Sequence, residues 1–282
     1  MMKIQFLGTA AAEGQPGLFC DCPTCTHARK FGGKDVRTRS QAIVDDTLLI
    51  DFPADTLHHC LMHGIDLTKI YHCLITHTHS DHLCPAELRW RIPGFSNMGE
   101  ENPFCLYGSE GAMAYAKADV VKAMGEGAEK VLKFTALPCY QKMQVGDYVV
   151  TGIPGLHAEN AYPMFYIIEN KEGKRLMYAH DTDYFMDEVW EYLEKEKPYL
   201  SFVSLDCTEA NLPQMYYTGH MNLENNKKVK DRLIAMGCAD ENTLFCCNHF
   251  SHNGVDVLYD TFSKCAKEQG FLTSYDGFVV EF

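Results

Sequence analysis

Four residues of metal-ligand type follow one short apolar run and point to hydrolytic metal chemistry. The run ends at Ile75, and the next seven positions contain all four: His77, His79, Asp81 and His82. In extended backbone His77 and His79, two positions apart, point the same way. The adjacent pair Asp81 and His82 points to different sides, so it can serve a second metal. Imidazole nitrogen and carboxylate oxygen suit zinc, manganese or iron(II).

A second group of ligand-type residues lies near the start of the chain. Gly17 and Pro23 give this segment the character of a loop, and it contains three closely spaced thiols: Cys20, Cys22 and Cys25. Thiolates at this spacing suit a closed tetrahedral zinc site, which needs a fourth ligand. The chain has thirteen cysteines, an odd number, and no export signal, so a disulfide framework is not expected.

The elements that must position these residues are mostly short strands bounded by turn residues. The strands are expected at Lys3–Leu7, Gln41–Val44, Thr47–Asp51, His72–Thr76, Pro103–Tyr107, Lys133–Leu137, Tyr148–Pro154, Met164–Glu169, Arg175–His180, Leu200–Asp206, Thr243–Cys247 and Gly277–Phe282. Apolar spacing of three and four predicts helices at Asp55–His63, Gly108–Met124, Met186–Lys195, Leu223–Met236 and Val255–Glu268. Asn222 is the expected N-cap of the fourth helix.

This order of elements favours an α/β protein with an αββα sandwich, in which two sheets pack face to face with helices outside. The order alone is compatible with other α/β folds. The position of the metal-type residues, nearly all just after a predicted strand, favours the sandwich. We find no internal repeat or linker, so residues 1–282 are expected to form one hydrolase domain.

The net charge and the lack of long apolar stretches restrict the kinds of molecule that the protein is expected to bind. The formal net charge is −13, and basic runs are short, as at Asn226–Lys230, so a nucleic-acid-binding face is not expected. No apolar stretch is long enough to cross a membrane, and the N-terminus is too quickly broken for a signal peptide, which predicts a cytoplasmic protein. A small anion remains an acceptable ligand because bound metal cations would dominate the local charge.

The run from His77 to His82 resembles the signature of the metallo-β-lactamase superfamily. The resemblance implies three more ligands, each at the end of a predicted strand: His157, Asp181 and His249. By the family pattern one metal is held by His77, His79 and His157, and the other by Asp81, His82 and His249, with Asp181 bridging both. His180 competes with Asp181, but a carboxylate can bridge two metals and an imidazole normally does not.

Two metals about 3.5–4 Å apart can hold a bridging hydroxide at neutral pH, and that hydroxide attacks a phosphorus or carbonyl centre. No protein nucleophile is then required, and the sequence has neither a Gly-x-Ser-x-Gly elbow nor a Walker-type phosphate loop. Asp81 is expected to be both a metal ligand and a catalytic residue.

The cysteine loop narrows the resemblance to the PhnP-like phosphodiesterases of this superfamily. That subfamily implies a structural zinc held by Cys20, Cys22, Cys25 and a histidine three residues after His249, which is His252; His27 is the alternative. A His-x-Asx-Leu stretch before a helix, here beginning at His220, places its histidine at the active site in such enzymes. His220 would contact the substrate phosphate or protonate the leaving oxygen, and the alternative is a surface histidine beside a helix.

The sequence departs from many relatives at two loops. His82 is followed by Leu83-Cys84-Pro85 and Asp51 by Phe52-Pro53, where relatives often have Gly. Both loops can shape the substrate pocket, so these departures put the substrate in doubt and not the chemistry. Asp51 itself is either an orienting partner of a ligand histidine or a plain structural residue.

The leading hypothesis is a phosphodiesterase acting on a small, for example cyclic, phosphate diester. It would use two catalytic divalent metals, zinc or manganese with iron as an alternative, and one structural zinc. A thioester or lactone hydrolase of the same superfamily is the second hypothesis. The third is a non-enzymatic, PqqB-like ligand-binding protein. A tRNase Z is disfavoured because no basic RNA-gripping insertion is present. A homodimer is compatible with the sequence.

Overall fold

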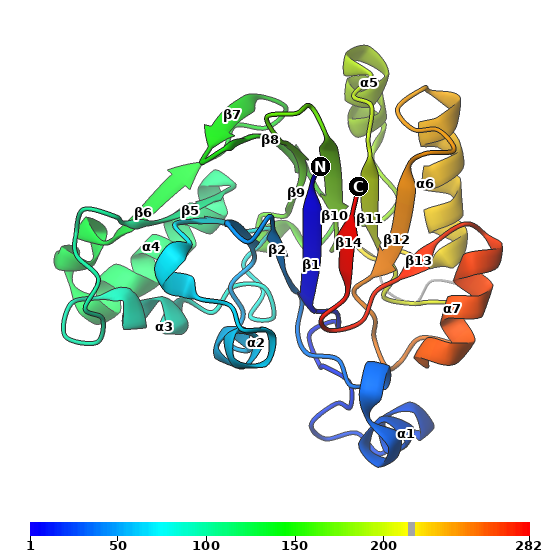
Figure 1. Cartoon of the computed structure of the whole chain (residues 1–282), viewed down its shortest axis with the longest axis horizontal. Coiled ribbons are helices and arrows are strands. Elements are labelled where there is room, and N and C mark those ends of the chain that lie inside the picture. The colour runs from blue at the N-terminus through cyan, green and yellow to red at the C-terminus, as the bar shows by residue number, and fades with distance from the viewer. Residues whose placement is uncertain (214–217) are drawn as a thin grey trace.

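The computed structural model describes residues 1–213 and 218–282, and its elements form four layers. Two sheets lie face to face at the centre, and helices cover their outer faces (Figure 1). The αββα sandwich expected from the sequence is confirmed.

The first sheet contains seven strands in the described part of the chain, in the order β14-β1-β2-β3-β4-β5-β6. Its pairs are antiparallel from β14 to β3 and parallel from β3 to β6. The strands are β1 (Lys3–Gly8), β2 (Gln41–Val44), β3 (Leu48–Ile50), β4 (His72–Leu74), β5 (Phe104–Gly108), β6 (Leu132–Ala136) and β14 (Val279–Glu281). The N-terminal and C-terminal strands therefore lie side by side near the centre of the molecule (Figure 1).

The second sheet also contains seven described strands, in the order β13-β12-β11-β10-β9-β8-β7. It is parallel from β13 to β10 and antiparallel from β10 to β7. The strands are β7 (Lys142–Val145), β8 (Tyr148–Pro154), β9 (Met164–Glu169), β10 (Arg175–Ala179), β11 (Phe202–Asp206), β12 (Leu244–Asn248) and β13 (Leu272–Thr273).

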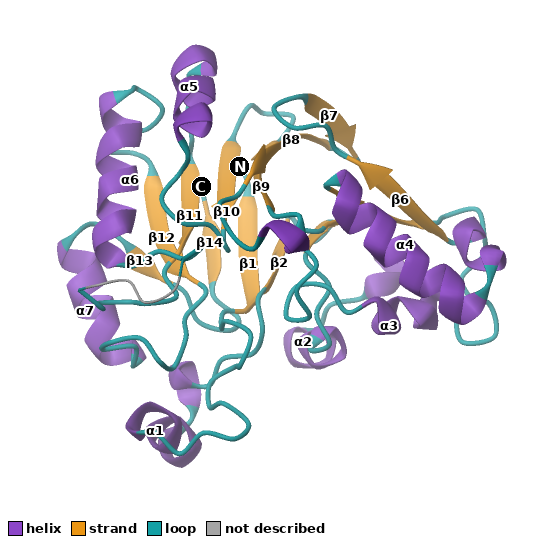
Figure 2. Ribbon diagram, turned by 180° about the vertical axis from the view of Figure 1, so that it is seen from behind, coloured by secondary structure: helices purple, strands orange, loops and turns teal. Residues whose placement is uncertain are grey.

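The helix α4 lies beside the first sheet and α5, α6 and α7 beside the second, whereas α1 lies apart at one end of the molecule (Figure 2). The helices are α1 (Pro23–Phe31), α2 (Thr56–His63), α3 (Pro85–Leu88), α4 (Glu110–Met124), α5 (Asp187–Glu196), α6 (Leu223–Ala235) and α7 (Tyr259–Glu268). Short 3₁₀ turns lie at Gly33–Asp35, Leu67–Lys69, Arg89–Arg91, Glu126–Lys130 and Glu159–Ala161. None of the helices in the described residues is both long and apolar enough to span a membrane.

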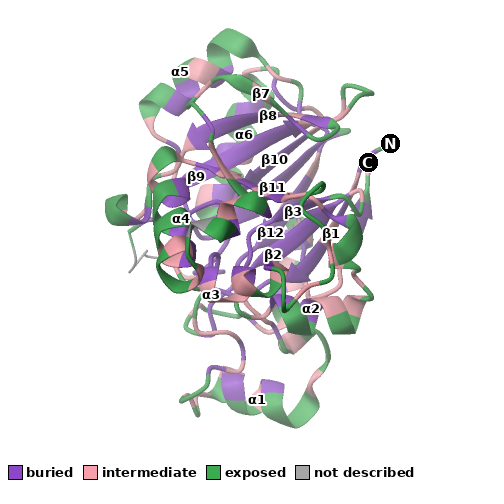
Figure 3. Ribbon diagram, turned by 90° about the vertical axis from the view of Figure 1, so that its left-hand side faces the viewer, coloured by how far each residue is buried: buried purple, intermediate pink, exposed green. Residues whose placement is uncertain are grey.

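Three apolar cores hold the layers together. The central core joins the inner faces of the two sheets and includes Phe6, Leu74, Tyr166 and Phe202. The other two lie between each sheet and its helices. Inner strands such as β2, β3 and β11 are buried on both faces, whereas β6, β7 and β14 contain exposed residues and the helices expose their outer sides (Figure 3). Burial on both faces is why several strands are continuous apolar runs and not alternating ones.

The predicted elements are largely confirmed. All twelve predicted strands form, with bounds within two residues, and Asn222 caps α6 by accepting a hydrogen bond from the Asn225 N–H at 2.8 Å. Two expectations were wrong. The cysteine segment is not loop throughout, because α1 begins at Pro23 with the Cys22 sulfur as its cap. The last helix begins at Tyr259 and not at Val255, because Asp256 has φ of +59°. The strands β7 and β13 and the helix α3 were missed.

Candidate metal centre

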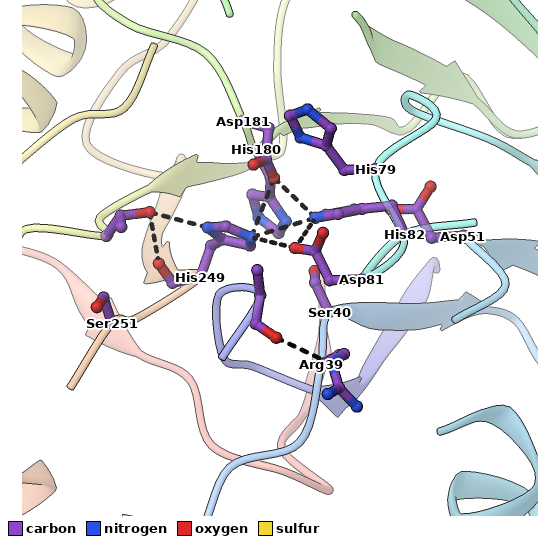
Figure 4. Close-up of polar contacts among 12 residues, drawn as sticks. Arg39, Ser40, Asp51, His79, Asp81, His82, His180, Asp181, His249 and Ser251 are labelled. Carbon is purple, nitrogen blue, oxygen red and sulfur yellow. Dashed lines mark hydrogen bonds and ion pairs between the residues drawn. The ribbon is translucent and has the colours of Figure 1, made fainter. Parts of the chain in front are cut away.

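Histidines and carboxylates from both sheets converge at one end of the sandwich. His77, His79, Asp81 and His82 follow β4, whereas the other three each follow a strand of the second sheet: His157 after β8, Asp181 after β10 and His249 after β12. Figure 4 shows Asp181, Asp81, His82 and His249 turned toward one another. The structure therefore brings together the seven residues that the sequence singled out.

The local backbone at three of these strand ends is strained. Asp51, Asp181 and His249 have φ of +69°, +51° and +65°, in the left-handed region that residues other than glycine rarely adopt. Backbone in sparsely populated regions is often found at functional sites.

The first group consists of three histidine rings around one centre. The His79 Nδ1 atom lies 3.0 Å from His77 Nε2 and 3.1 Å from His157 Nε2. Asp181 Oδ1 closes the group, at 3.9 Å from His77 Nε2 and 3.7 Å from His157 Nε2. The Nδ1 atom of His157 faces the Gly219 carbonyl at 3.0 Å, which leaves its Nε2 as the atom directed at the group.

The second group faces the other oxygen of Asp181. His82 Nε2 lies 2.9 Å and His249 Nε2 3.0 Å from Asp181 Oδ2, and the two nitrogens are 3.2 Å apart. Asp81 Oδ2 completes the group at 3.2 Å from His82 Nε2. Asp181 therefore offers one oxygen to each group, as a bridging carboxylate must.

The donor chemistry fits two cations. On the far side of its ring, His82 Nδ1 lies 2.7 Å from the buried carboxylate of Asp51, which makes Nδ1 the donor and turns the Nε2 lone pair inward. Asp181 Oδ2 is buried and has no hydrogen-bond donor, although two imidazole nitrogens lie within 3.0 Å of it. Lone pairs that face one another in a buried site repel unless a cation lies between them. The residues present therefore fit a pair of divalent metals.

The electrostatics of the site agree with this fit. Burial acts to raise the pKa of Asp181, yet His249 and His82 hold it well below its usual range. Burial also acts to lower the pKa of His249, yet Asp181, together with Asp206 and Asp81, raises it to about 10. The carboxylates thus favour positive charge between them, which bound metals would supply.

His180, the competitor of Asp181, points elsewhere. Its ring is buried, with Nε2 at 2.8 Å from the Ser204 hydroxyl and Nδ1 at 3.2 Å from Asn248 Nδ2. Burial lowers its pKa to about 3, so it is a neutral residue of the interior. Asp51 takes the orienting position, since it contacts His82 and also accepts hydrogen bonds from the Thr76 amide and hydroxyl.

His220 lies beside the metal groups, where the sequence placed it. Its Nδ1 atom lies 3.0 Å from Asp206 Oδ2 and 3.1 Å from the Thr208 hydroxyl. Burial acts to lower the pKa of His220, but the Asp206 carboxylate outweighs it and raises that pKa. His220 therefore lines the cavity with its Nδ1 atom held by Asp206 and with a raised pKa.

Asp206 was missed by the sequence interpretation, although it ends a predicted strand as most of the ligands do. Its carboxylate accepts hydrogen bonds from the backbone N–H groups of Asp181, Thr208 and Met221 at 3.0–3.1 Å. Asp206, His220, His249 and Asp181 lie close enough together to form an alternative metal group. The three backbone donors engage both Asp206 oxygens, so we regard Asp206 as the residue that positions His220 and His249.

The three cysteines form a separate site with His252. Their sulfur atoms and a ring nitrogen of His252 all lie within 4.8 Å of one another, and His252 Nδ1 is 3.7 Å from both Cys20 Sγ and Cys22 Sγ. His27, the alternative, lies outside the group, with its Nε2 3.4 Å from an Asp35 carboxylate oxygen. This set could bind a structural metal.

Backbone contacts support the cysteine site from within the loop. The Gly17 N–H donates to Cys25 Sγ at 3.2 Å, and the Cys25 N–H donates to Cys22 Sγ at 3.4 Å. Arg29 fixes the loop by donating to the carbonyls of Gly17 and Cys20. Burial raises the pKa of Cys25 to about 12, so a metal bound here would have to displace its proton.

A cavity of about 320 Å³ opens onto the metal groups. Its lining includes Asp181 and His220, together with Glu13, Ser251 and Asn253 from two loops. A cavity of this size accommodates a small molecule.

Comparisons with known proteins agree with the fold. Coenzyme PQQ synthesis protein B of Methylobacterium radiotolerans is 31% identical over 140 residues, which are 45% of this chain and 44% of that protein. Ribonuclease Z of Staphylococcus aureus is 35% identical over 121 residues, 41% of this chain and 33% of that protein. The matched part thus spans less than half the length of these curated relatives.

Solved structures match over almost the whole chain. A Zn²⁺-bound PqqB from Methylobacterium extorquens superposes with a TM-score of 0.77 at 19% identity, covering 99% of this chain and 100% of that one. A diphosphatase from the PhnP family superposes with a TM-score of 0.71 at 20% identity, covering 100% and 97%. Human tRNase Z, short form, superposes with a TM-score of 0.67 at 15% identity, covering 99% of this chain and 98% of that one.

The family model described as the β-lactamase superfamily domain matches residues 47–235, which are 189 of the 282 residues. This segment contains the run from His77 to His82 and the later residues His157, Asp181 and His220. With its buried two-group cluster of histidines and carboxylates, the chain belongs to the metallo-β-lactamase superfamily of metal-dependent hydrolases.

Proposed function

We propose that this protein is a di-metal phosphodiesterase that hydrolyses a small phosphate diester. One observation carries the proposal: Asp181 offers its two oxygens to two separate ligand groups, and His220 stands beside them in the same cavity. One group is His77, His79 and His157, and the other is Asp81, His82 and His249. Two divalent metals held there would supply Lewis-acid activation of water and of the substrate phosphate.

The protein's own residues would perform the remaining tasks. Asp181 and Asp81 fix the spacing between the two groups. His220, which Asp206 orients and whose pKa Asp206 raises, would donate a proton to the leaving oxygen or a hydrogen bond to the phosphate. Thr208 would steady His249, whose Nδ1 lies 2.8 Å from its hydroxyl. This division of roles needs no protein nucleophile.

The cavity favours a small substrate over a long RNA. Its described lining contains neither Lys nor Arg, and the chain has a formal net charge of −13. An RNA-processing enzyme must neutralise several phosphates with basic side chains. The identity with ribonuclease Z, confined to 121 residues, is therefore better explained by the shared fold and ligand motif.

The cysteine site supports membership of the PhnP-like subfamily and a structural zinc. Cys20, Cys22, Cys25 and His252 would form a closed tetrahedral site. Because His252 follows the ligand His249 by three residues, zinc there would tie the N-terminal loop to the strand end that supplies His249. We infer that this zinc stabilises the catalytic geometry without taking part in the reaction.

Two other functions have specific support. A PqqB-like ligand-binding protein is favoured by the 31% identity over 140 residues and by the high structural similarity to PqqB. A thioester or lactone hydrolase would use the same ligand groups, because they act equally on a carbonyl oxygen. The paired His220 and Asp206 favour an enzyme over a binder, since a binding protein needs no positioned proton donor.

The test combines metal analysis with a substrate panel. Purified protein should contain three metals per chain, and should hydrolyse bis-p-nitrophenyl phosphate with the activity abolished in Asp81→Ala. The panel should include thioesters and lactones at equal concentration. Metal-loaded protein that cleaves no phosphodiester, or that cleaves only the carbonyl compounds, would overturn the proposal. A ligand bound tightly and recovered chemically unchanged would favour the binding function.

A further inference from the structure

One carboxylate of the active-site cavity has no place in the metal groups. Glu13 lines the cavity on the loop after β1, next to Ala11 and Ala12. The cavity's other ionisable side chains in the described residues are the metal-group residues and His220. Residues 214–217, outside the described part, contain neither Lys nor Arg in the sequence. Glu13 is therefore the charged side chain that would face the part of a substrate lying outside the metal-bound phosphate.

The position of Glu13 is fixed by contacts with the segment after β12. The Ser251 hydroxyl donates to Glu13 Oε1, and His252 Nε2 and Asn253 Nδ2 lie 3.8 Å and 3.5 Å from the same oxygen. The Ala11 N–H donates to the Phe250 carbonyl at 2.9 Å, which holds the two segments together. Among the described residues, Glu13 Oε2 has no hydrogen-bond partner. One oxygen thus anchors the side chain while the other is left for a ligand.

A second cavity, of about 330 Å³, adjoins the first at Glu13. Its lining includes Leu18 and Phe19, and the Phe19 side chain is fully exposed to solvent. Arg39 also lines this cavity, but its guanidinium lies 3.3 Å from the Asp55 carboxylate and donates to the Ala12 carbonyl. A substrate arm extending from the metal centre would therefore pass a carboxylate and an aromatic face, a combination that attracts a cationic group.

We propose that Glu13 is a specificity residue that acts as a charge filter on the substrate. It disfavours diesters whose second arm carries a negative group and favours arms that are neutral or carry an ammonium. The inference rests on the proposed function, because it concerns the second ester group of the diester, which would lie outside the metal centre when the phosphate is bound there. It also separates this protein from enzymes acting on diphosphates, whose substrates carry two anionic phosphorus groups side by side.

The experiment uses three p-nitrophenyl phosphodiesters with one leaving group and different second arms: ethyl, carboxyethyl and choline. The leaving group is constant, so differences in kcat/KM report the arm. The full-length, metal-loaded protein should prefer choline and ethyl over carboxyethyl. In Glu13→Gln the ratio of choline to carboxyethyl should fall by about tenfold or more, mainly through the KM for each arm, because one charge has been removed.

Controls separate a charge effect from damage to the loop. Glu13→Gln keeps an acceptor for Ser251, so its zinc content and thermal unfolding midpoint should equal those of the wild type. Asp21→Asn removes the same charge from an exposed position of the same loop and should leave the ratio unchanged. If Glu13→Gln keeps its zinc and its preference among the three arms, the charge filter is wrong. If the wild type cleaves none of the three, the proposed function fails instead.

Discussion

The Asp51 carboxylate and the His82 ring meet in the fully buried interior, with Asp51 Oδ2 at 2.7 Å from His82 Nδ1. The other oxygen of Asp51 is held by the Thr76 amide at 2.7 Å. This contact fixes which ring nitrogen of His82 carries the proton and which faces the second ligand group. Carboxylates that orient a ligand histidine in this way also increase its basicity.

Replacing Asp51 by Asn should weaken metal binding at the second group by about 10- to 100-fold. The amide keeps the shape but loses the negative charge that polarises His82. The measurement is a competition titration with a chromogenic chelator on protein stripped of metal. Asp46→Asn, at an exposed position, is the matched control and should bind as the wild type does. Equal affinities in both variants would show that Asp51 is only structural.

Gly219 lies against the first ligand group and should tolerate no side chain. Its φ is +93°, and a Cβ atom there would come within 2.6 Å of His157 Nδ1. Gly219→Ala should displace His157 and reduce metal affinity at the group that includes His77 and His79. Gly173→Ala is the matched control, because its φ is +79° but nothing lies within 4 Å of the added atom. Both variants should lose about 1 kcal/mol of stability from backbone strain, and only Gly219→Ala should lose metal.

Part of the site was predictable from the residues themselves, because His77, His79, Asp81 and His82 follow one apolar strand within seven positions. His157, Asp181 and His249 each also follow a strand, but it was the resemblance to the metallo-β-lactamase superfamily that singled them out. Asp206 carries the same signal and was passed over, because a single carboxylate at a strand end does not reveal that it meets His220, fourteen residues later. Only the packing of the segment at His220 against β11 creates that pair.

The fold was predictable where apolar runs are long and less so where short elements depend on distant partners. The strand β13 has two residues and exists because it pairs with β12. The helix α1 begins inside the cysteine loop because Pro23 and the Cys22 sulfur favour a helix start. The cysteine spacing indicated only a zinc ligand at Cys22 and gave no sign that its sulfur also caps a helix. Glu13 gave no sequence signal, since its position on the cavity wall depends on a loop more than two hundred residues away.

The buried His59 should make the free energy of unfolding decrease as the pH falls below neutral. It is fully buried, with Nδ1 at 2.6 Å from Gln41 Oε1, and burial lowers its pKa from 6.5 to about 3. The unfolded chain therefore binds a proton below pH 6.5 that the folded chain refuses until about pH 3. Its contribution to stability is complete above pH 6.5 and falls as pH decreases, by up to about 1.4 kcal/mol per pH unit.

The measurement is the free energy of unfolding by urea at several values between pH 7 and pH 4. His59→Gln should give a shallower dependence on pH than the wild type, whatever its absolute stability. His58→Gln changes the exposed neighbour on the same helix and should keep the wild-type slope. Parallel curves for the wild type and His59→Gln would contradict the prediction.

Loss of one cysteine should remove the structural zinc selectively. Cys22→Ser should contain one metal fewer than the wild type and unfold at a lower temperature, because metal binding at such a site contributes directly to folding. Cys139 is an exposed cysteine outside the group, so Cys139→Ser should keep the wild-type metal content and the wild-type midpoint of thermal unfolding. Chelation of the wild type should lower its midpoint to that of Cys22→Ser or further. Unchanged zinc in Cys22→Ser would exclude this thiol as a ligand.

His220 and Asp206 should reveal their roles through the leaving group. If His220 protonates the leaving oxygen, His220→Ala should lose about 10²- to 10⁴-fold in kcat with an alkyl leaving group, which needs the proton, and far less with p-nitrophenolate, which leaves unaided. Asp206→Asn should show the same selectivity more weakly, because it leaves the imidazole in place but removes the charge that raises its pKa. Equal losses for both leaving groups would instead mean that His220 binds the phosphate and moves no proton. Metal content must match the wild type in both variants, since Asp206 also lies 3.4 Å from the Nδ1 atom of the ligand His249.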